Sequence, residues 1–377
     1  GAFRTARPTD AEGALTLLFG GDVAGQNVCR DAREGFPIFS SIVAAKPDLF
    51  LGLGDMIYGD DTCLAVGRYG NAQIAGAFGK ATDREGYWAH WRYVREDAGL
   101  RALLEAAPYV AVWDDHEVLN DAGPLQDVPG EAPYEAGVPL LPIGRAAFLD
   151  WNPVAQPPTE EKVLHRSLRW GRHVEIVVLD TRGHRDANAA PDDPAAPKTM
   201  LGPAQRAWLE ARLLSSDATW KIVVSSVPIA IPTGGASARD GWTGLGTTSG
   251  FHRELLGILR ALADGGVRNL VFLTTDVHFA AAFRYQPFAD RPDFVLHELV
   301  TGPRNAGRFP NRVVDPSLGA ERLFFHGPES PAAVAGWEDA KRWFNFGAVV
   351  VAEDGDLLLE VRDVEGATLY ALRLRPD

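Results

Sequence analysis

Four short apolar runs in the sequence are each followed closely by side chains that can bind a metal ion. The runs and these side chains are residues 15–19 with Asp22, 47–53 with Asp55 and Tyr58, 109–112 with Asp115 and His116, and 269–273 with Asp276 and His278. Runs of this kind are typical of buried β-strands. Ligands gather beyond the carboxyl ends of strands in α/β sheets, so we expect these side chains to meet. Because several buried carboxylates are tolerable only with a cation among them, the set predicts a metal site.

Each of these side chains has a simpler explanation when it is taken alone. An aspartate after a strand caps a helix or shapes a turn more often than it binds a metal. The stretch VWDDHEVLND, residues 112–121, brings several carboxylates, an imidazole and an amide to one strand end. Four such strand ends in one chain favour the metal site over four separate caps.

The rest of the chain alternates strand-like and helix-like patterns, which predicts a layered α/β fold. Further strands are expected at 174–179 and 221–224, three more within 344–374, and helices at 36–45, 88–97, 100–106, 145–151, 203–214 and 253–263. Residues 123–142 and 187–198 are rich in Pro and Gly and read as long loops, which are often functional. Because the sequence contains no repeat or low-complexity linker, we expect a single domain over 1–377, with its core at about 15–350 and the strands of 344–374 completing the sheets.

Charge and composition exclude several classes of function. The net charge is -13 and basic residues form no run, so a nucleic-acid interface is not expected. The apolar runs are too short to span a membrane, and the given amino terminus does not show a basic segment followed by an apolar run, the pattern of a secretory signal, so a signal removed earlier stays open. Cys29 and Cys63 are the only two cysteines. Each follows a strand-end motif, so either one disulfide or two free thiols is possible.

The motifs GGDV, GDMIYGD, WDDHEVLND, LDTRGHR, SSVPI and TTDVHFA occur in this order. In this order they resemble the alkaline phosphatase D (PhoD-like) branch of the calcineurin-like metallophosphoesterases. The resemblance runs from about Leu15 to the FNFG segment that ends at Gly347. It implies a four-layer αββα sandwich with metal ions at one edge and β-hairpins at the C-terminus.

The resemblance also implies a first metal site. By match to the family motifs, Asp22 binds the first metal and Asp55 bridges two metals. In relatives with the GDxxY form, including purple acid phosphatases, the tyrosine that matches Tyr58 binds ferric iron as a phenolate. His278 matches the second histidine of the family's GHxH motif. Two carboxylates, a phenolate and an imidazole suit a hard trivalent cation, so Fe³⁺ is expected at this site.

The second site departs from the general superfamily. Asp115 stands where the superfamily has the Asn of GNHE, Asp276 replaces the first histidine of GHxH, and serines occupy the usual upstream histidine position. Asn120 either completes this site or shapes the next turn together with Asp121. Oxygen ligands favour Ca²⁺, with Mn²⁺, Mg²⁺ or Zn²⁺ as alternatives. Some PhoD-like members carry a cysteine where Asp22 stands, so the iron ligands here differ from theirs.

The implied reaction is hydrolysis of a phosphoester by metal-activated water. His116 is the expected proton donor to the leaving group, with Asp114 or Glu117 orienting its ring. The alternative is a structural histidine at a strand end. Asp60 and Asp61 are expected to lie outside the ligand shell or in solvent.

Substrate contacts are predicted from one further motif and one aromatic residue. Arg182 and Arg185 in DTRGHR are expected to hold phosphoryl oxygens, and Arg182 thereby to take part in catalysis. Ion pairs with Asp180 or Asp186 are the alternative. Trp113 is a candidate pocket wall, although a tryptophan more often packs in the core.

The sequence therefore predicts a metal-dependent phosphoesterase that acts on phosphate monoesters or diesters. Within the same class, a phospholipase D-like diesterase acting on lipid headgroups is the alternative. A non-catalytic metal- or phosphate-binding module is the alternative from another class. A serine hydrolase using Ser225 or Ser226 is not expected, because the GxSxG elbow is missing. The family's export habit implies a secreted or periplasmic protein, with the cytoplasm as the alternative, and the oligomeric state stays open.

Overall fold

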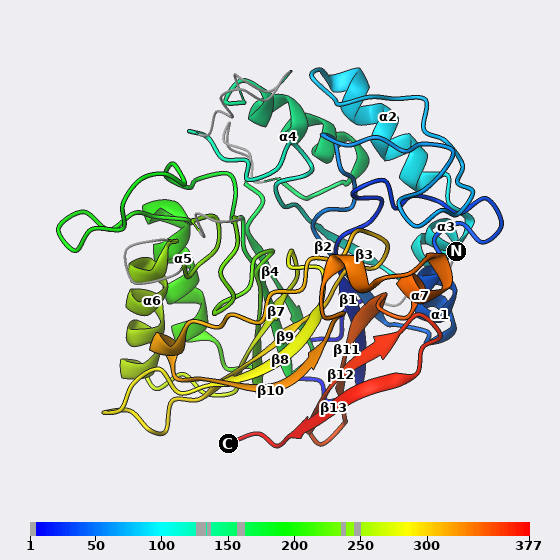
Figure 1. Ribbon diagram of the computed structural model, residues 1–377. Coiled ribbons are helices and arrows are strands. Elements are labelled where there is room, and N and C mark those ends of the chain that lie inside the picture. The colour runs from blue at the N-terminus through cyan, green and yellow to red at the C-terminus, as the bar shows by residue number, and fades with distance from the viewer. Residues whose placement is uncertain (1–4, 126–132, 134–136, 157–162, 235–238, 245–249) are drawn as a thin grey trace.

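The computed structural model describes residues 5–125, 133, 137–156, 163–234, 239–244 and 250–377. Two β-sheets pack face to face, and helices cover the outer face of each (Figure 1). The arrangement is therefore a four-layer αββα sandwich, as the sequence predicts.

The first sheet has the strand order β13-β12-β11-β1-β2-β3 within the described residues. Its strands are β1 (Leu15–Gly20), β2 (Leu49–Leu53), β3 (Tyr109–Val112), β11 (Asn345–Val351), β12 (Leu357–Asp363) and β13 (Thr368–Leu374). β1, β2 and β3 run parallel, whereas β11 to β13 form an antiparallel meander against β1. The parallel order brings the carboxyl ends of β1, β2 and β3 to the same edge of the sheet.

The second sheet has the order β10-β8-β9-β7-β6-β5-β4 within the same residues. Its strands are β4 (Arg166–Trp170), β5 (Val174–Val178), β6 (Trp220–Val224), β7 (Leu270–Thr274), β8 (Ala280–Tyr285), β9 (Leu296–Val300) and β10 (Ala320–His326). β5, β6, β7 and β9 are parallel. Their residues are almost all buried, as expected for strands covered on both faces.

Helices pack on both outer faces. Those near the first sheet are α1 (Ile38–Ala44), α2 (Arg84–Arg95), α3 (Ala98–Ala106), α4 (Leu140–Trp151) and the short α7 (Trp337–Lys341), and those on the second are α5 (Gly202–Ser215) and α6 (His252–Asp264). Between the sheets, side chains such as Leu17, Phe19 and Ile222 form a fully buried core. This core fixes the two sheets against each other and so fixes the edge where their strands end.

Most of the expected elements are confirmed, but four strands were not expected from the sequence. β8 reads AAAFRY, and its alanines give little strand signal, whereas β4 and β10 are half-exposed strands with charged residues among the apolar ones. β9 was also missed. α2 and α4 begin four and five residues earlier than predicted, so part of the expected 123–142 loop is helical, and most of its middle lies outside the described residues.

The two cysteines form a disulfide, Cys29–Cys63, with their Cα atoms 5.8 Å apart. This decides between the two possibilities that the sequence left open. Among the described helices, none combines the length and apolar character needed to cross a bilayer.

Candidate metal centre

The predicted ligands lie where the strands of both sheets end. Asp22 follows β1, Asp55 follows β2, Asp115 follows β3 and Asp276 follows β7. Asp22, Asp55, Asp276 and His278 all have positive φ, between 50° and 76°. This conformation is uncommon for residues other than glycine, costs about 1–3 kcal/mol, and clusters at functional sites. The chain turns sharply at each of these strand ends and so aims the side chains at a common point.

The first group contains Asp22, Asp55 and His278, whose ligand atoms all lie within 4.8 Å of one another. His278 Nε2 lies 2.9 Å from the hydroxyl of Tyr58 and 3.7 Å from Asp22 Oδ1. His278 Nδ1 lies 2.8 Å from the carbonyl oxygen of Gly307, which fixes the proton on Nδ1 and leaves the Nε2 lone pair facing the group. The four side chains predicted for the first metal therefore come together.

The second group contains Asp55, Asp114, Asp115 and Asp276, again with their ligand atoms within 4.8 Å. Asp55 belongs to both groups and is fully buried. A shared carboxylate between two adjacent ligand sets is the geometry that a bridging ligand requires. Asn120, also predicted here, lines the same cavity but is an exposed residue.

Burial sets the electrostatics of both groups. Burial raises the pKa of the Asp22 carboxyl to about 7, and together with the neighbouring Asp115 it raises the pKa of Asp55 well above its usual value. Asp22 Oδ1 and Asp55 Oδ2 are buried atoms without a hydrogen-bond partner. Burial also lowers the pKa of His278 to about 3, so its imidazole is neutral, as a metal ligand must be. Unpaired buried carboxylate oxygens and a neutral imidazole fit a cation site.

His116 is oriented by Asp60, one of the two carboxylates expected to lie outside the ligand shell or in solvent. Its Nδ1 lies 2.6 Å from Asp60 Oδ1, and the other Asp60 oxygen accepts the backbone N–H of Asn120 at 2.9 Å. Burial alone lowers the pKa of His116, but the Asp60 and Asp115 carboxylates outweigh burial and raise it well above the usual value. The imidazolium of His116 therefore lines the cavity, and Asp60 holds the ring in place through Nδ1.

The prediction that Asp114 or Glu117 orients His116 is wrong. Glu117 instead accepts the backbone N–H groups of Asp114 at 2.7 Å, Met56 at 2.8 Å and Asp55 at 3.1 Å. It thereby holds the turns after β2 and β3 together. Asp114 Oδ1 instead accepts from Arg182 Nε at 2.5 Å and from the Ser226 hydroxyl at 2.7 Å.

Arg182 does not face the cavity. Its Nε donates to Asp114 Oδ1 at 2.5 Å, and its two Nη atoms donate to the Asp240 carboxylate at 2.6 and 2.9 Å. Arg182 Nη2 also lies 3.7 Å from Asp115 Oδ1. The predicted ion-pair partners Asp180 and Asp186 are replaced by Asp114 and Asp240, because Arg182 is fully buried between the strand ends.

Arg185 and Trp113 are buried as well. Arg185 Nη1 donates to Asp240 Oδ1 at 2.6 Å. The indole N–H of Trp113 donates to Asp180 Oδ1 at 2.7 Å, and the residue is 1% exposed. Neither lines the cavity, so the geometry does not favour their predicted contact with substrate.

A cavity of about 580 Å³ opens over the ligand groups. Its lining includes residues that sequence reasoning missed, namely Gln26, Thr233, Phe309 and Asn311. These side chains come from long loops without a motif, so no local signal points to them. Asp240, which lies on another such loop, was missed for the same reason.

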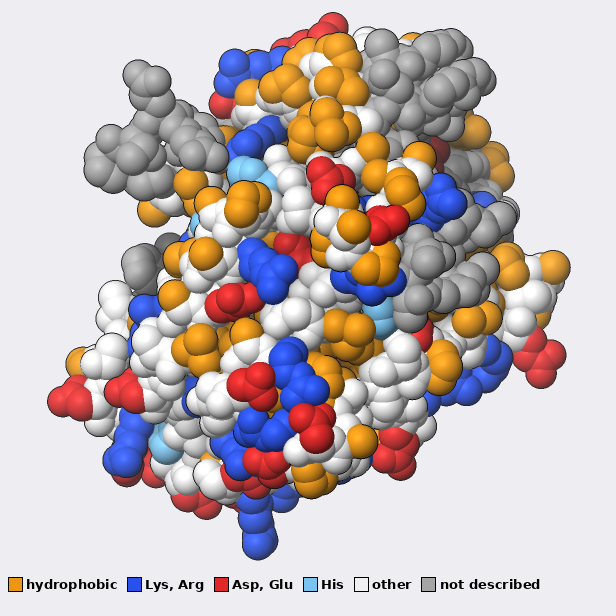
Figure 2. Space-filling model, turned by 90° about the vertical axis from the view of Figure 1, so that its left-hand side faces the viewer, with side chains coloured by type: hydrophobic (Ala, Val, Ile, Leu, Met, Phe, Trp, Pro, Cys, Tyr) orange, Lys and Arg blue, Asp and Glu red, His pale blue; other side chains and the backbone are white. Residues whose placement is uncertain are grey.

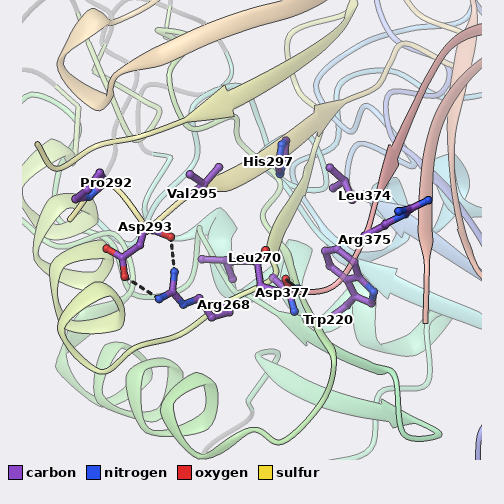
Figure 3. A pocket seen from close by; sticks show the side chains of 11 residues that line it. Trp220, Arg268, Leu270, Pro292, Asp293, Val295, His297, Leu374, Arg375 and Asp377 are labelled. Atoms are coloured by element: carbon purple, nitrogen blue, oxygen red, sulfur yellow. Dashed lines mark hydrogen bonds and ion pairs between the residues drawn. The ribbon is translucent and has the colours of Figure 1, made fainter. Parts of the chain in front are cut away.

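A second pocket, of about 470 Å³, lies at the opposite ends of the parallel strands (Figure 3). Trp220 and Leu270, the first residues of β6 and β7, line it together with His297 and Arg375. Arg268 on its wall is paired with Asp293, as the dashed lines show. None of the ligand groups found among the described residues includes a residue of this pocket, so the metal centre belongs to the other edge.

Two packed sheets with a shared-carboxylate ligand cluster at one edge define a protein of the metallophosphoesterase type. A family profile described as PhoD-like phosphatase matches residues 18–345, and the chain belongs to that family. Alkaline phosphatase D of Bacillus subtilis (strain 168) is 28% identical over 262 residues, which is 66% of this chain and 44% of that protein. The chain thus spans less than half the length of this curated relative.

Solved structures give the same fold. A structure of PhoD superposes with a TM-score of 0.74 at 22% identity, covering 98% of this chain and 70% of the other. Purple acid phosphatase PPD1 from yellow lupin (Lupinus luteus) seeds gives a TM-score of 0.57 at 14% identity, covering 98% and 55%. At these identities the likeness concerns the fold, and the site must be argued from this chain's own residues.

Proposed function

We propose that this chain is a metal-dependent phosphoesterase that hydrolyses phosphate monoesters or diesters. The single observation that carries the proposal is Asp55, a fully buried carboxylate that belongs to three of the four ligand groups among the described residues and is left with one oxygen unpaired. Two metal ions held by these groups would stabilise the phosphoryl oxygens electrostatically and supply a nucleophilic water of lowered pKa. Membership of the PhoD-like phosphatase family supports the same reaction.

The donor sets favour different ions at the two positions. Asp22, Asp55, Tyr58 and His278 would hold Fe³⁺, because a phenolate and two carboxylates suit a hard trivalent ion. The second position would be held by oxygen donors from Asp55, Asp115, Asp276 and Asn120. That set favours Ca²⁺, with Mn²⁺, Mg²⁺ or Zn²⁺ as alternatives.

In this mechanism His116 protonates the leaving oxygen. It lines the cavity beside Asp55 and Asp115, and its other ring nitrogen is held by Asp60 at 2.6 Å. Asp60 is thus a positioning residue, since it orients the ring and stabilises the imidazolium. Arg182 and Arg185 act behind the site, where they fix Asp114 and Asp240 and so the loop that carries Asp115.

The same reasoning extends to location. The Cys29–Cys63 disulfide is typical of proteins that fold outside the reducing cytosol. Together with the family's export habit, it supports a secreted or periplasmic protein.

The test compares turnover of a nitrophenyl phosphate and a bis-nitrophenyl phosphate before and after chelation, and after each candidate metal is added back. We expect chelation to abolish turnover and the matching metals to restore it. Asp55→Asn is expected to lower turnover at least about a thousandfold, because the bridging ligand is lost. Asp61→Asn is the matched control: it changes a carboxylate in the same loop that belongs to none of the ligand groups.

Three results decide the outcome. Turnover that survives in Asp55→Asn contradicts the bridging assignment. Metal binding by the native chain without any turnover assigns it instead to the non-catalytic module. A chain that cleaves phosphatidylcholine but neither nitrophenyl ester favours the phospholipase D-like alternative.

A further inference from the structure

Most of the exposed large apolar side chains lie on segments that are close in sequence to the lining of the metal cavity, and one of them lines it. Seven such residues are exposed in the part of the chain that the structure describes: Leu64, Val66, Ile74, Leu125, Leu214, Phe309 and Val313. Phe309 lines the cavity, Val313 lies two residues after the lining residue Asn311, and Leu125 lies four after Asp121. Only Leu214, on α5, lies in an element remote from the cavity. Apolar exposure concentrated in one place marks an interaction surface.

Three of these residues share one face of a small hairpin, residues 63–76, which we call the rim hairpin. Val66 and Ala72 form an antiparallel bridge, with the N–H of Gln73 donating to Ala65 at 2.8 Å. Opposed residues point to the same side, and so do positions two further along each strand. Leu64, Val66 and Ile74 therefore stand together, 56%, 62% and 43% exposed.

The rim hairpin is fixed to the body of the protein. Its base is joined by the Cys29–Cys63 disulfide, and the buried Gln73 side chain accepts the N–H of Cys29 at 2.6 Å and donates to the carbonyl of Leu64 at 3.0 Å. The Asn27 side chain bonds Leu64 N and Val66 O. Because this backbone is held in place, the apolar side chains stay in solvent unless a partner covers them.

The two sequence segments that form the rim differ in charge from the chain as a whole. The sequence carries 50 acidic residues, yet none lies between Asp61 and Asp83 or between Glu298 and Asp315. Arg68, at the tip of the rim hairpin, lies over the ring of Phe309 at 5.7 Å and so links the two segments. Neither Arg68 nor the exposed Arg312 forms an ion pair with a described carboxylate. The two rim segments thus carry basic but no acidic side chains, and the acidic residue beside the hairpin, Asp31, accepts a hydrogen bond from the Asn71 side chain at 3.1 Å.

We propose that this rim docks on the surface of a phospholipid bilayer. Leu64, Val66, Ile74 and Phe309 enter the headgroup region, and Arg68 and Arg312 lie against lipid phosphates. Apolar side chains next to unpaired arginines are the combination that interfacial membrane contacts use. The face over α5 and α6 offers a contrast, since acidic and basic side chains are interspersed there (Figure 2). Arg260 of α6, for example, donates to Asp290 at 2.8 Å. Docking would place the cavity against a surface rich in phosphoesters, which gives the proposed function its substrate class.

Docking is tested by flotation with vesicles of phosphatidylcholine and phosphatidylglycerol, which requires no turnover. The triple variant Leu64→Ser, Val66→Ser and Ile74→Ser should bind the vesicles at least about tenfold more weakly than the native chain, because buried apolar area is lost. Leu214→Ser, the matched control, should bind like the native chain. The triple variant should hydrolyse a soluble nitrophenyl ester at the native rate, because none of the three side chains lines the cavity.

Docking is overturned if the native chain does not float with the vesicles, or if the triple variant floats equally well. It is also overturned if light scattering shows a native dimer that the triple variant separates, because the rim would then cover a second copy of the chain. The docking surface itself does not depend on the proposed function; only the inferred substrate class, a phosphoester of the membrane surface, does. Vesicle binding without ester hydrolysis would therefore defeat the proposed function and leave the docking surface standing.

Discussion

Two clusters of buried carboxylates adjoin each other at the strand ends, and they differ in how their charge is balanced. Asp240 and Asp114 form close ion pairs with Arg182, and Asp240 also with Arg185. Asp22, Asp55 and Asp276 form no ion pair with a described arginine or lysine. The chain therefore supplies its own cations where carboxylates hold loops together, and leaves other carboxylates unbalanced where an outside cation is to bind.

The pKa values follow this division. Burial favours the protonated form of Asp240, but Arg182 and Arg185 outweigh it and lower its pKa far below the usual value. In the unbalanced cluster, burial and the Asp114 and Asp115 charges raise the pKa of Asp276 well above its usual value. Asp114 lies between the two: burial raises its pKa to about 6 even though Arg182 lies 2.5 Å away, and Asp115 adds to the increase.

The largest expected effect comes from removing the positive charge that balances Asp114 and Asp240. Arg182→Met leaves Asp114 and Asp240 buried without their main partner, and breaking a buried ion pair in this way costs about 3–5 kcal/mol. We expect the free energy of unfolding in denaturant to fall by that amount. Arg260→Met, which breaks an exposed ion pair with Asp290, is the control and should cost less than about 1 kcal/mol. Equal losses in the two variants would erase the distinction between the clusters.

An intermediate effect is expected from pH in the metal-free chain. Asp22 has a folded pKa of about 7 and a usual value of 3.8, so the folded chain holds this proton more tightly than the unfolded chain does. Its contribution to stability is fully present below about pH 4 and is lost as pH rises to about 7. Over this range the midpoint of thermal unfolding of the metal-free native chain should therefore fall relative to that of Asp22→Asn.

Added metal should reverse this trend, because cation binding requires the ionised carboxylates. A metal-free native chain whose stability does not fall between pH 4 and 7 relative to Asp22→Asn would contradict the unbalanced state of Asp22. Asp22→Asn should flatten the profile and serves as the internal control.

The smallest expected effect is that of Asp276→Asn on stability, which should change sign when metal is added. Asp276→Asn removes a buried charge that no described arginine or lysine pairs, so it should stabilise the metal-free chain by about 1–2 kcal/mol at pH 8. In the presence of metal the same variant should be less stable than the native chain, because a ligand is lost. Denaturant titrations of both chains, with and without metal, measure the two differences. A loss of stability in both conditions would mean that Asp276 is structural.

The sequence predicts which carboxylates the fold brings together where each lies directly after a strand. Asp22, Asp55 and Asp276 follow buried apolar runs, and a parallel sheet brings such positions to one edge. The positioning of His116 could not be predicted, because Asp60 reaches it only after two turns fold against each other, 56 residues apart. The same holds for Arg182 and Asp240, which are 58 residues apart on loops. Pairing of charges across loops depends on the packed fold and leaves no periodic signal.

The central claim is tested most directly by counting the metal ions that the purified chain binds. The account predicts two ions per chain by elemental analysis after chelation, metal addition and gel filtration. It also predicts that Asp55→Asn loses metal from both positions, whereas Arg260→Met retains it. A native chain that is stably folded at pH 8 and retains no metal ion would contradict it.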